Sequence, residues 1–265
     1  MSDTNVDHNN GDEEQLAEGT LLSHLIELRS RVVKSVATVV VLLICLVPFT
    51  QKIFDLVAYP LMAKLPAGHK MLATHPASTF FTPFKTTVFV AILLAMPVIL
   101  YQVWSFVSPG LYRREKRFAV PLLVSSVVLF YTGMLFAYYV VFPLMFSFFS
   151  RTTPSGVQFS PDIAEYLSFV MTLLFAFGVA FEVPIATVLL TLTGLISLKK
   201  LRSFRPYVLL GCFVVAMFLT PPDAISQTLL AVPMYALYEG GILMARVLLP
   251  DKAVEADEAE ADGKS

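Results

Sequence analysis

Long apolar segments without charged side chains occupy most of this 265-residue chain. About 20 consecutive apolar residues cross the hydrocarbon core of a bilayer as a helix, and a charge placed inside that core is costly. Four such segments are residues 35–51, 86–112, 118–150 and 166–192, the last with the single acid Glu182. Two more follow Arg205, so the pattern predicts an all-α integral membrane protein with six transmembrane helices.

Prolines limit the last two helices. The run Thr220–Asp223 contains two consecutive prolines and predicts a turn between them. Pro206 and this turn leave Tyr207–Thr220 for the fifth helix, about 21 Å at 1.5 Å per residue, whereas a bilayer core is about 30 Å thick. We therefore expect short fifth and sixth spans. Alternatively, the fifth helix extends into the flanking loops, with Pro206 in its first turn and Ser203 or a neighbour capping it.

Lys and Arg residues are concentrated in every second connection, in segments 29–34, 113–117, 199–205 and 246–264. Because these residues favour the cytoplasmic side of short loops, we expect both chain termini to be cytoplasmic.

The two connections assigned to the outer side, residues 52–83 and 151–165, are too long for simple turns and predict an ordered outer cap. Ile53, Leu56 and Val57 recur at helical spacing in the first of them, continuing to Leu61, and predict a short helix in the membrane interface. A packed loop with a purely structural role is the alternative.

Composition excludes a water-soluble globule, because 56% of the residues are hydrophobic and only 15% are charged. A net charge of −1 gives no reason to expect nucleic acid as a partner. Cys45 and Cys212 stand in apolar runs without a Cys/His cluster, so we expect no disulfide framework, metal site or cofactor.

The two chain ends are acidic and lack an apolar period. We expect residues 1–18 and 250–265 to be disordered tails around a membrane domain spanning residues 19–249. The N-terminal segment lacks the basic region of a cleavable signal peptide, which predicts that it is retained.

Two acids lie in segments expected on the cytoplasmic side. Glu27 shares a helix face with Arg31, and the simplest interpretation is an i, i+4 ion pair of about 0.3–0.5 kcal/mol. Glu115 is the one acid among four cations in residues 108–117. It could receive an incoming cation or form a local salt bridge.

Glu182 lies near the middle of the fourth span, where an ionisable side chain usually faces a bundle interior or a wet cavity. The spans contain no Lys or Arg to pair with it, so we expect contact with polar groups such as Gln102 or Thr187. A structural hydrogen bond is the alternative to a functional role.

Six motifs resemble the TatC component of the twin-arginine translocase over residues 20–249. They are HLIELR at 24–29, STFFTP at 78–83, YQVW at 101–104, FGVAFEVP at 177–184, RPYV at 205–208 and LTPPD at 219–223. The resemblance implies a non-enzymatic receptor for folded proteins that carry a twin-arginine signal peptide. In it, Glu27 and Glu115 match the acids that bind the arginine pair, and Arg29 belongs to the same site. Bidentate guanidinium–carboxylate geometry makes this assignment chemically reasonable.

The resemblance further implies a bacterial inner-membrane oligomer in contact with lipid, with TatA-like and TatB-like single-span partners and transport driven by the proton-motive force. A concave cavity containing Glu182 is implied as well. We assign Gln227 and Asp223 to the same intramembrane set for partner contact or translocation.

Two other classes of function compete with this interpretation. A secondary transporter would also use several spans and a midplane acid, but the sequence shows no internal repeat. An intramembrane hydrolase would need a base beside a nucleophile or a metal set, yet all four His residues lie outside the spans.

Overall fold

The computed structural model describes residues 7–62, 72–107, 119–152, 162–220 and 223–250. These residues form helices without a strand; a single isolated bridge joins Leu72 to Asp162. Five of the helical segments are long and apolar enough to cross a membrane, and a shorter apolar helix, α9 (Arg205–Leu219), is the sixth. The predicted all-helical membrane fold is confirmed.

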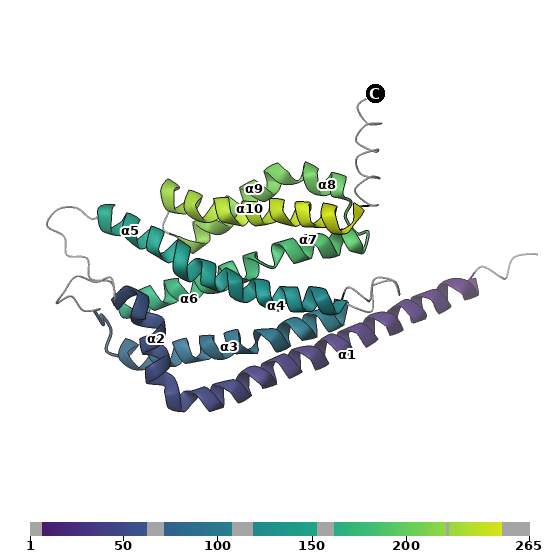
Figure 1. Cartoon of the computed structure of the whole chain (residues 1–265). Helices are drawn as coiled ribbons and strands as arrows, with labels where there is room; N and C mark the ends of the chain where they lie inside the picture. The colour runs from purple at the N-terminus through teal and green to yellow at the C-terminus, as the bar shows by residue number, and fades with distance from the viewer. Residues whose placement is uncertain (1–6, 63–71, 108–118, 153–161, 221–222, 251–265) are drawn as a thin grey trace, which may run out of the picture.

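The helices run roughly along one direction and form a bundle with two ends (Figure 1). We call the end that contains α8 (Leu198–Ser203) the α8 end, where α3 (Ser78–Val107) and α10 (Ala224–Leu248) also finish and α4 (Ala119–Phe136) begins. The opposite end, which contains α2 (Thr50–Met62), is the α2 end.

Helix α1 (Asp7–Leu46) is the longest element, with 40 residues, and extends beyond the rest of the bundle at the α8 end (Figure 1). Its contacts are chiefly with α3. The helix starts well before residue 19, where we placed the start of the membrane domain. The division into a membrane domain and two acidic tails stays a prediction, since residues 1–6 and 251–265 lie outside the described residues.

The ordered cap expected at the α2 end stays a prediction, because residues 63–71 and 153–161 of its two connections lie outside the described residues. A 3-10 turn, η1 (Val47–Phe49), connects α1 to α2, which confirms the short helix expected in this connection. The buried side chains of α2 are Phe54 and Ala58, whereas Leu56, which belongs to the predicted apolar stripe, is 73% exposed. The two outer connections meet where Thr74 and Asp162 hydrogen-bond, with Thr74 Oγ1 2.6 Å from Asp162 Oδ2.

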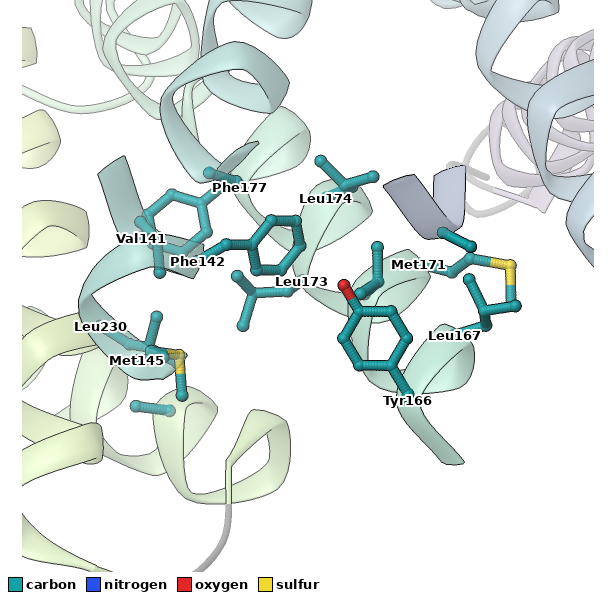
Figure 2. Packing of buried hydrophobic residues seen from close by; sticks show 14 of the residues in the cluster. Val141, Phe142, Met145, Tyr166, Leu167, Met171, Leu173, Leu174, Phe177 and Leu230 are labelled. Atoms are coloured by element: carbon teal, nitrogen blue, oxygen red, sulfur yellow. The ribbon is translucent and has the colours of Figure 1, made fainter. Parts of the chain in front are cut away.

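The third span is one helical run of three parts: α4, a π-helical turn η4 (Ala137–Val141) and α5 (Phe142–Thr152). The main core lies where this run meets α6 (Ile163–Ala180). Figure 2 shows Leu173 and Phe177 of α6 in one buried cluster with Phe142, Met145 and, from α10, Leu230. Helix α6 is therefore the central element of the bundle.

Helices α7 (Val183–Leu192) and α10 pack closely at Gly241. A Cβ atom added at Gly241 would lie 2.9 Å from the Cα atom of Pro184 and would overlap the hydroxyl oxygen of Thr187. The absent side chain thus permits backbone-level contact between the two helices.

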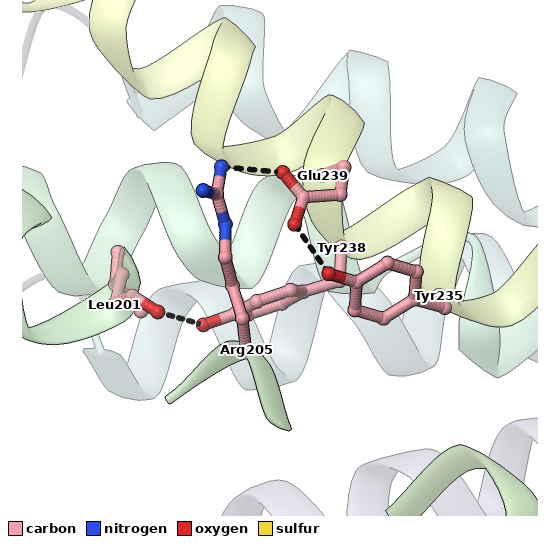
Figure 3. Close-up of polar contacts among 5 residues, drawn as sticks. All are labelled: Leu201, Arg205, Tyr235, Tyr238 and Glu239. Carbon is pink, nitrogen blue, oxygen red and sulfur yellow. Dashed lines mark hydrogen bonds and ion pairs between the residues drawn. The ribbon is translucent and has the colours of Figure 1, made fainter. Parts of the chain in front are cut away.

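The expectation of a short sixth span was wrong. Helix α10 has 25 residues, about 37 Å at 1.5 Å per residue. It continues past Pro233 and past Glu239, which is paired with Arg205 (Figure 3). The fifth span is short as predicted: α9 has 15 residues, with Pro206 in its first turn and α8 immediately before it.

Candidate functional site

Glu27 lies on α1 at the level of the α8 end. Its position is 19 residues before the end of α1 at Leu46, about 29 Å along the helix axis, close to the thickness of a bilayer core. A carboxylate at this position therefore lies about one core thickness from the end of α1. This depth agrees with a role in contacting a ligand that approaches from water.

The ion pair expected between Glu27 and Arg31 is present. The Arg31 Nε atom donates to Glu27 Oε1 at 3.1 Å, and Nη2 donates to the same oxygen. The Glu27 side chain is 39% exposed and the Arg31 side chain 19% exposed. Arg31 thus orients the acid, while within the described part of the chain Oε2 accepts no bond and can meet an added guanidinium group.

The two residues assigned to the same site are placed differently. Arg29 is exposed and lies two positions after Glu27, so the helix directs it to another face. Glu115 falls in residues 108–118, outside the described residues. Helix α3 ends at Val107 and α4 begins at Ala119, both at the α8 end of the bundle (Figure 1).

Glu182 stands in a break within the fourth span. Helix α6 ends at Ala180 and α7 begins at Val183, with Pro184 in its first turn. The Glu182 backbone is satisfied, because its N–H donates to Val179 O and its carbonyl accepts from the N–H of Ala186. The side chain does not cap α7, so it is available for other contacts.

The Glu182 carboxyl meets Ser126 of α4, rather than Gln102 or Thr187 as the sequence suggested. Ser126 is fully buried, and its oxygen accepts a hydrogen bond from the indole Nε1 of Trp104 at 3.1 Å. That bond leaves the Ser126 O–H free to donate to the carboxyl. Trp104 of α3 and Ser126 of α4 therefore lie beside Glu182.

One oxygen of this carboxyl, Oε1, is buried without a hydrogen-bond partner among the described residues. Burying a polar atom without a partner is unfavourable by about 1–3 kcal/mol. Such an atom marks a place where water, a proton or a polar ligand group would be stabilised, which favours a functional role over a purely structural hydrogen bond.

The structure does not bring Gln227 and Asp223 to Glu182. Asp223 caps α10: its Oδ2 accepts from the N–H of Ser226 at 2.6 Å. Gln227 lies in the first turn of α10, 14 residues and about 21 Å before Gly241, where α10 meets Pro184. The intramembrane set therefore occupies two depths, Glu182 in the middle of the bundle and the other two residues at the α2 end.

Three of the polar contacts between distant segments bear on these residues and on the cap, and none of them was found from the sequence. One is the Trp104–Ser126 bond. The second is the pair between Arg205 Nη2 and Glu239 Oε2 at 2.7 Å (Figure 3), which Tyr235 joins through its hydroxyl. No local signal identifies such partners, because they lie 22 or more positions apart in the chain.

The third contact holds the outer cap. Asp162 accepts bonds from the hydroxyl and N–H of Thr74 and from the N–H groups of Ala164 and Glu165. These donors, with the Thr74 hydroxyl contributing most, hold the pKa of the Asp162 carboxyl well below its usual range. Asp162 both caps α6 and ties it to the connection after α2.

A protein-family model described as Sec-independent protein translocase protein (TatC) matches residues 23–233. The chain belongs to the TatC family. A TatC protein of Escherichia coli is 58% identical over 226 residues, covering 85% of this chain and 88% of that protein. A TatC protein of Azotobacter chroococcum is 56% identical over 238 residues, covering 89% and 93%.

A solved TatC structure has the same fold. A crystal structure of the twin-arginine translocase receptor TatC superposes with a TM-score of 0.74 at 35% identity, covering 84% of this chain and 98% of the crystallised chain. The match confirms the TatC resemblance found in the motifs. The chain is a multi-span membrane protein of a protein-transport family.

Proposed function

We propose that this TatC protein is the receptor of a twin-arginine translocase and binds the signal peptides of folded cargo proteins at the α8 end. The observation that carries the proposal is Glu27: a partly exposed carboxylate about one core thickness from the end of α1, oriented by Arg31 and with one oxygen available. An arginine of the signal peptide would first meet Oε2 and, by displacing Arg31 from Oε1, bind both oxygens in the geometry that a lysine cannot reproduce.

Glu115 would receive the second arginine, and Arg29 would border the site. Two carboxylates on separate segments suit two adjacent guanidinium groups, since each side chain can take one partner. The α8 end would face the cytoplasm of a bacterial cell, with both termini on that side and the protein in the inner membrane. This orientation is supported by the concentration of Lys and Arg in the segments at that end.

TatA-like and TatB-like single-span proteins and further copies of this chain would be its partners, with transport driven by the proton-motive force and no chemical reaction catalysed. Glu182 would provide an intramembrane polar contact for cargo or a partner. Gln227 and Asp223 would act separately from it, nearer the α2 end, as their positions on α10 indicate.

The proposal is tested by measuring signal-peptide binding to the full-length protein in nanodiscs. Glu27→Gln should weaken binding of a twin-arginine peptide about tenfold or more, because a hydrogen bond to a charged group is lost. A peptide with two lysines in place of the arginines should bind the unmodified protein weakly, and Glu27→Gln should reduce that discrimination.

Glu165→Gln is the matched control, since it removes one acid from the α2 end and should leave binding unchanged. Equal affinity of the unmodified protein and the Glu27→Gln variant for the twin-arginine peptide would exclude Glu27 from the site. Solute uptake into vesicles by this chain alone would instead support the transporter alternative.

A further inference from the structure

A pocket of about 600 Å³ lies at the α8 end, between α8, the start of α9 and the last turns of α10. Three arginines line it, one from each helix: Arg202, Arg205 and Arg246. Among the described residues that line it, Glu239 is the one acid, so guanidinium groups outnumber carboxylates there by two. None of these residues was assigned to the signal-peptide site.

The pocket is held by contacts between its helices. The Tyr238 hydroxyl donates to the carbonyl of Leu201 at 2.7 Å and so ties α10 to α8 (Figure 3). Arg205 and Tyr235 engage one oxygen each of Glu239. Because both Glu239 oxygens already have partners, this acid offsets the charge of Arg205, and the described lining residues together carry a positive formal charge.

The pocket borders an exposed apolar surface of α10. Leu243 is both in the pocket lining and 64% exposed, and Val247, one turn further along α10, is 70% exposed. Ile242, beside Leu243, is buried against α7 and α8 and gives the pocket an apolar wall. A molecule with a negative head and an apolar tail could therefore place its head among the arginines and its tail along α10.

We propose that this arginine pocket binds the phosphate group of an anionic phospholipid, with the acyl chains along Leu243 and Val247. Guanidinium groups bind phosphate oxygens in paired hydrogen bonds, and basic pockets between spanning helices at the membrane surface suit phospholipid head groups. A phosphate free in water would use the arginines but gain nothing from the exposed leucine and valine. The juxtaposition of both features thus selects the lipid.

The test is native mass spectrometry of the full-length protein titrated with phosphatidylglycerol or phosphatidylcholine. We expect tighter binding of phosphatidylglycerol, and about fivefold weaker binding of it by Arg246→Gln, since one basic residue near a membrane surface contributes about that much. Arg202→Gln should act in the same direction. Leu243→Ser should weaken the lipid complex while leaving the arginines in place.

Lys199→Gln is the matched control. Lys199 is exposed on α8 and does not line the pocket, so its substitution removes the same charge from outside the pocket. A loss of affinity as large in Lys199→Gln as in Arg246→Gln would overturn the proposal in favour of diffuse surface charge. Competition with inorganic phosphate distinguishes a lipid site from a site for free phosphate. If phosphate displaces phosphatidylglycerol only at far higher concentrations, the lipid proposal is supported. Equal affinity of the pocket for phosphate and for phosphatidylglycerol would overturn the proposal. Thermal unfolding of each variant confirms that the fold is intact.

Discussion

The indole Nε1 of Trp104 lies 3.1 Å from the hydroxyl oxygen of Ser126, so that α3 and α4 are joined beside Glu182. The bond is buried, and it uses the Ser126 oxygen as acceptor while leaving its proton for the carboxyl. One serine thereby connects a structural contact to an intramembrane acid.

Ser126→Ala should therefore affect both stability and transport. It leaves the indole N–H of Trp104 buried without an acceptor, which we expect to lower the free energy of unfolding by about 1–3 kcal/mol. Trp104 is the single tryptophan of the chain, so its fluorescence reports the change directly. The control is Ser125→Ala, whose exposed hydroxyl donates only to the Pro121 carbonyl. Equal stability and emission in both variants would contradict the assigned bond.

Glu182 should tolerate Gln better than Leu. Gln keeps the ability to hydrogen-bond with Ser126 and with water, whereas Leu removes every polar contact at this depth. Export of a twin-arginine reporter protein should fall most for Glu182→Leu, at equal levels of membrane-inserted protein. Normal export by Glu182→Leu would show that this carboxyl contacts neither cargo nor partner.

Adjacent glycines on α10 should respond oppositely to alanine. Gly241→Ala forces a methyl group against Pro184 and Thr187 and should destabilise the protein by about 1–3 kcal/mol. Gly240→Ala enters open space and should be neutral or stabilising by up to about 1 kcal/mol, because alanine favours helix. Thermal unfolding in one detergent gives the comparison. Similar midpoints for both variants would mean that α7 and α10 are not packed at Gly241.

Asp162 should make the outer cap sensitive to acid. Its pKa is lowered in the folded protein by the Thr74, Ala164 and Glu165 donors, so its contribution to stability is present above the unfolded-state value of about 4. That contribution is lost as the pH falls toward the lower folded-state pKa. Thermal midpoints measured from pH 6 downward should decline less for Asp162→Asn than for the unmodified protein. Parallel profiles would show that Asp162 does not titrate against these donors.

Helix α9 should thin the membrane around it. Its 15 residues reach about 22 Å, against a core of about 30 Å, so lipid, water or a partner helix must adjust. Spin labels placed along residues 207–219 and read for depth in bilayers should report a thinner apolar layer than labels along α10. A full-thickness profile beside α9 would contradict this expectation.

The sequence determined the features that depend on local properties of the chain. Apolar length sets which segments can cross the membrane, and helical spacing located α2. Two prolines set the length of α9, while Glu182 and Pro184 stand at the break of the fourth span. These properties are independent of other segments, because the bilayer requires every spanning backbone to satisfy its own hydrogen bonds.

The tertiary structure alone decided which polar groups meet. Asp162 bonds with Thr74 across 88 positions, and Arg205 pairs with Glu239 across 34. Helix α10 continues past Pro233 and past Glu239, so the sixth span expected to be short is a full-length helix. Packing also separated Gln227 from Glu182 and joined three arginines in one pocket. Such contacts depend on the relative depth and rotation of packed helices, which side-chain packing fixes and no single segment encodes.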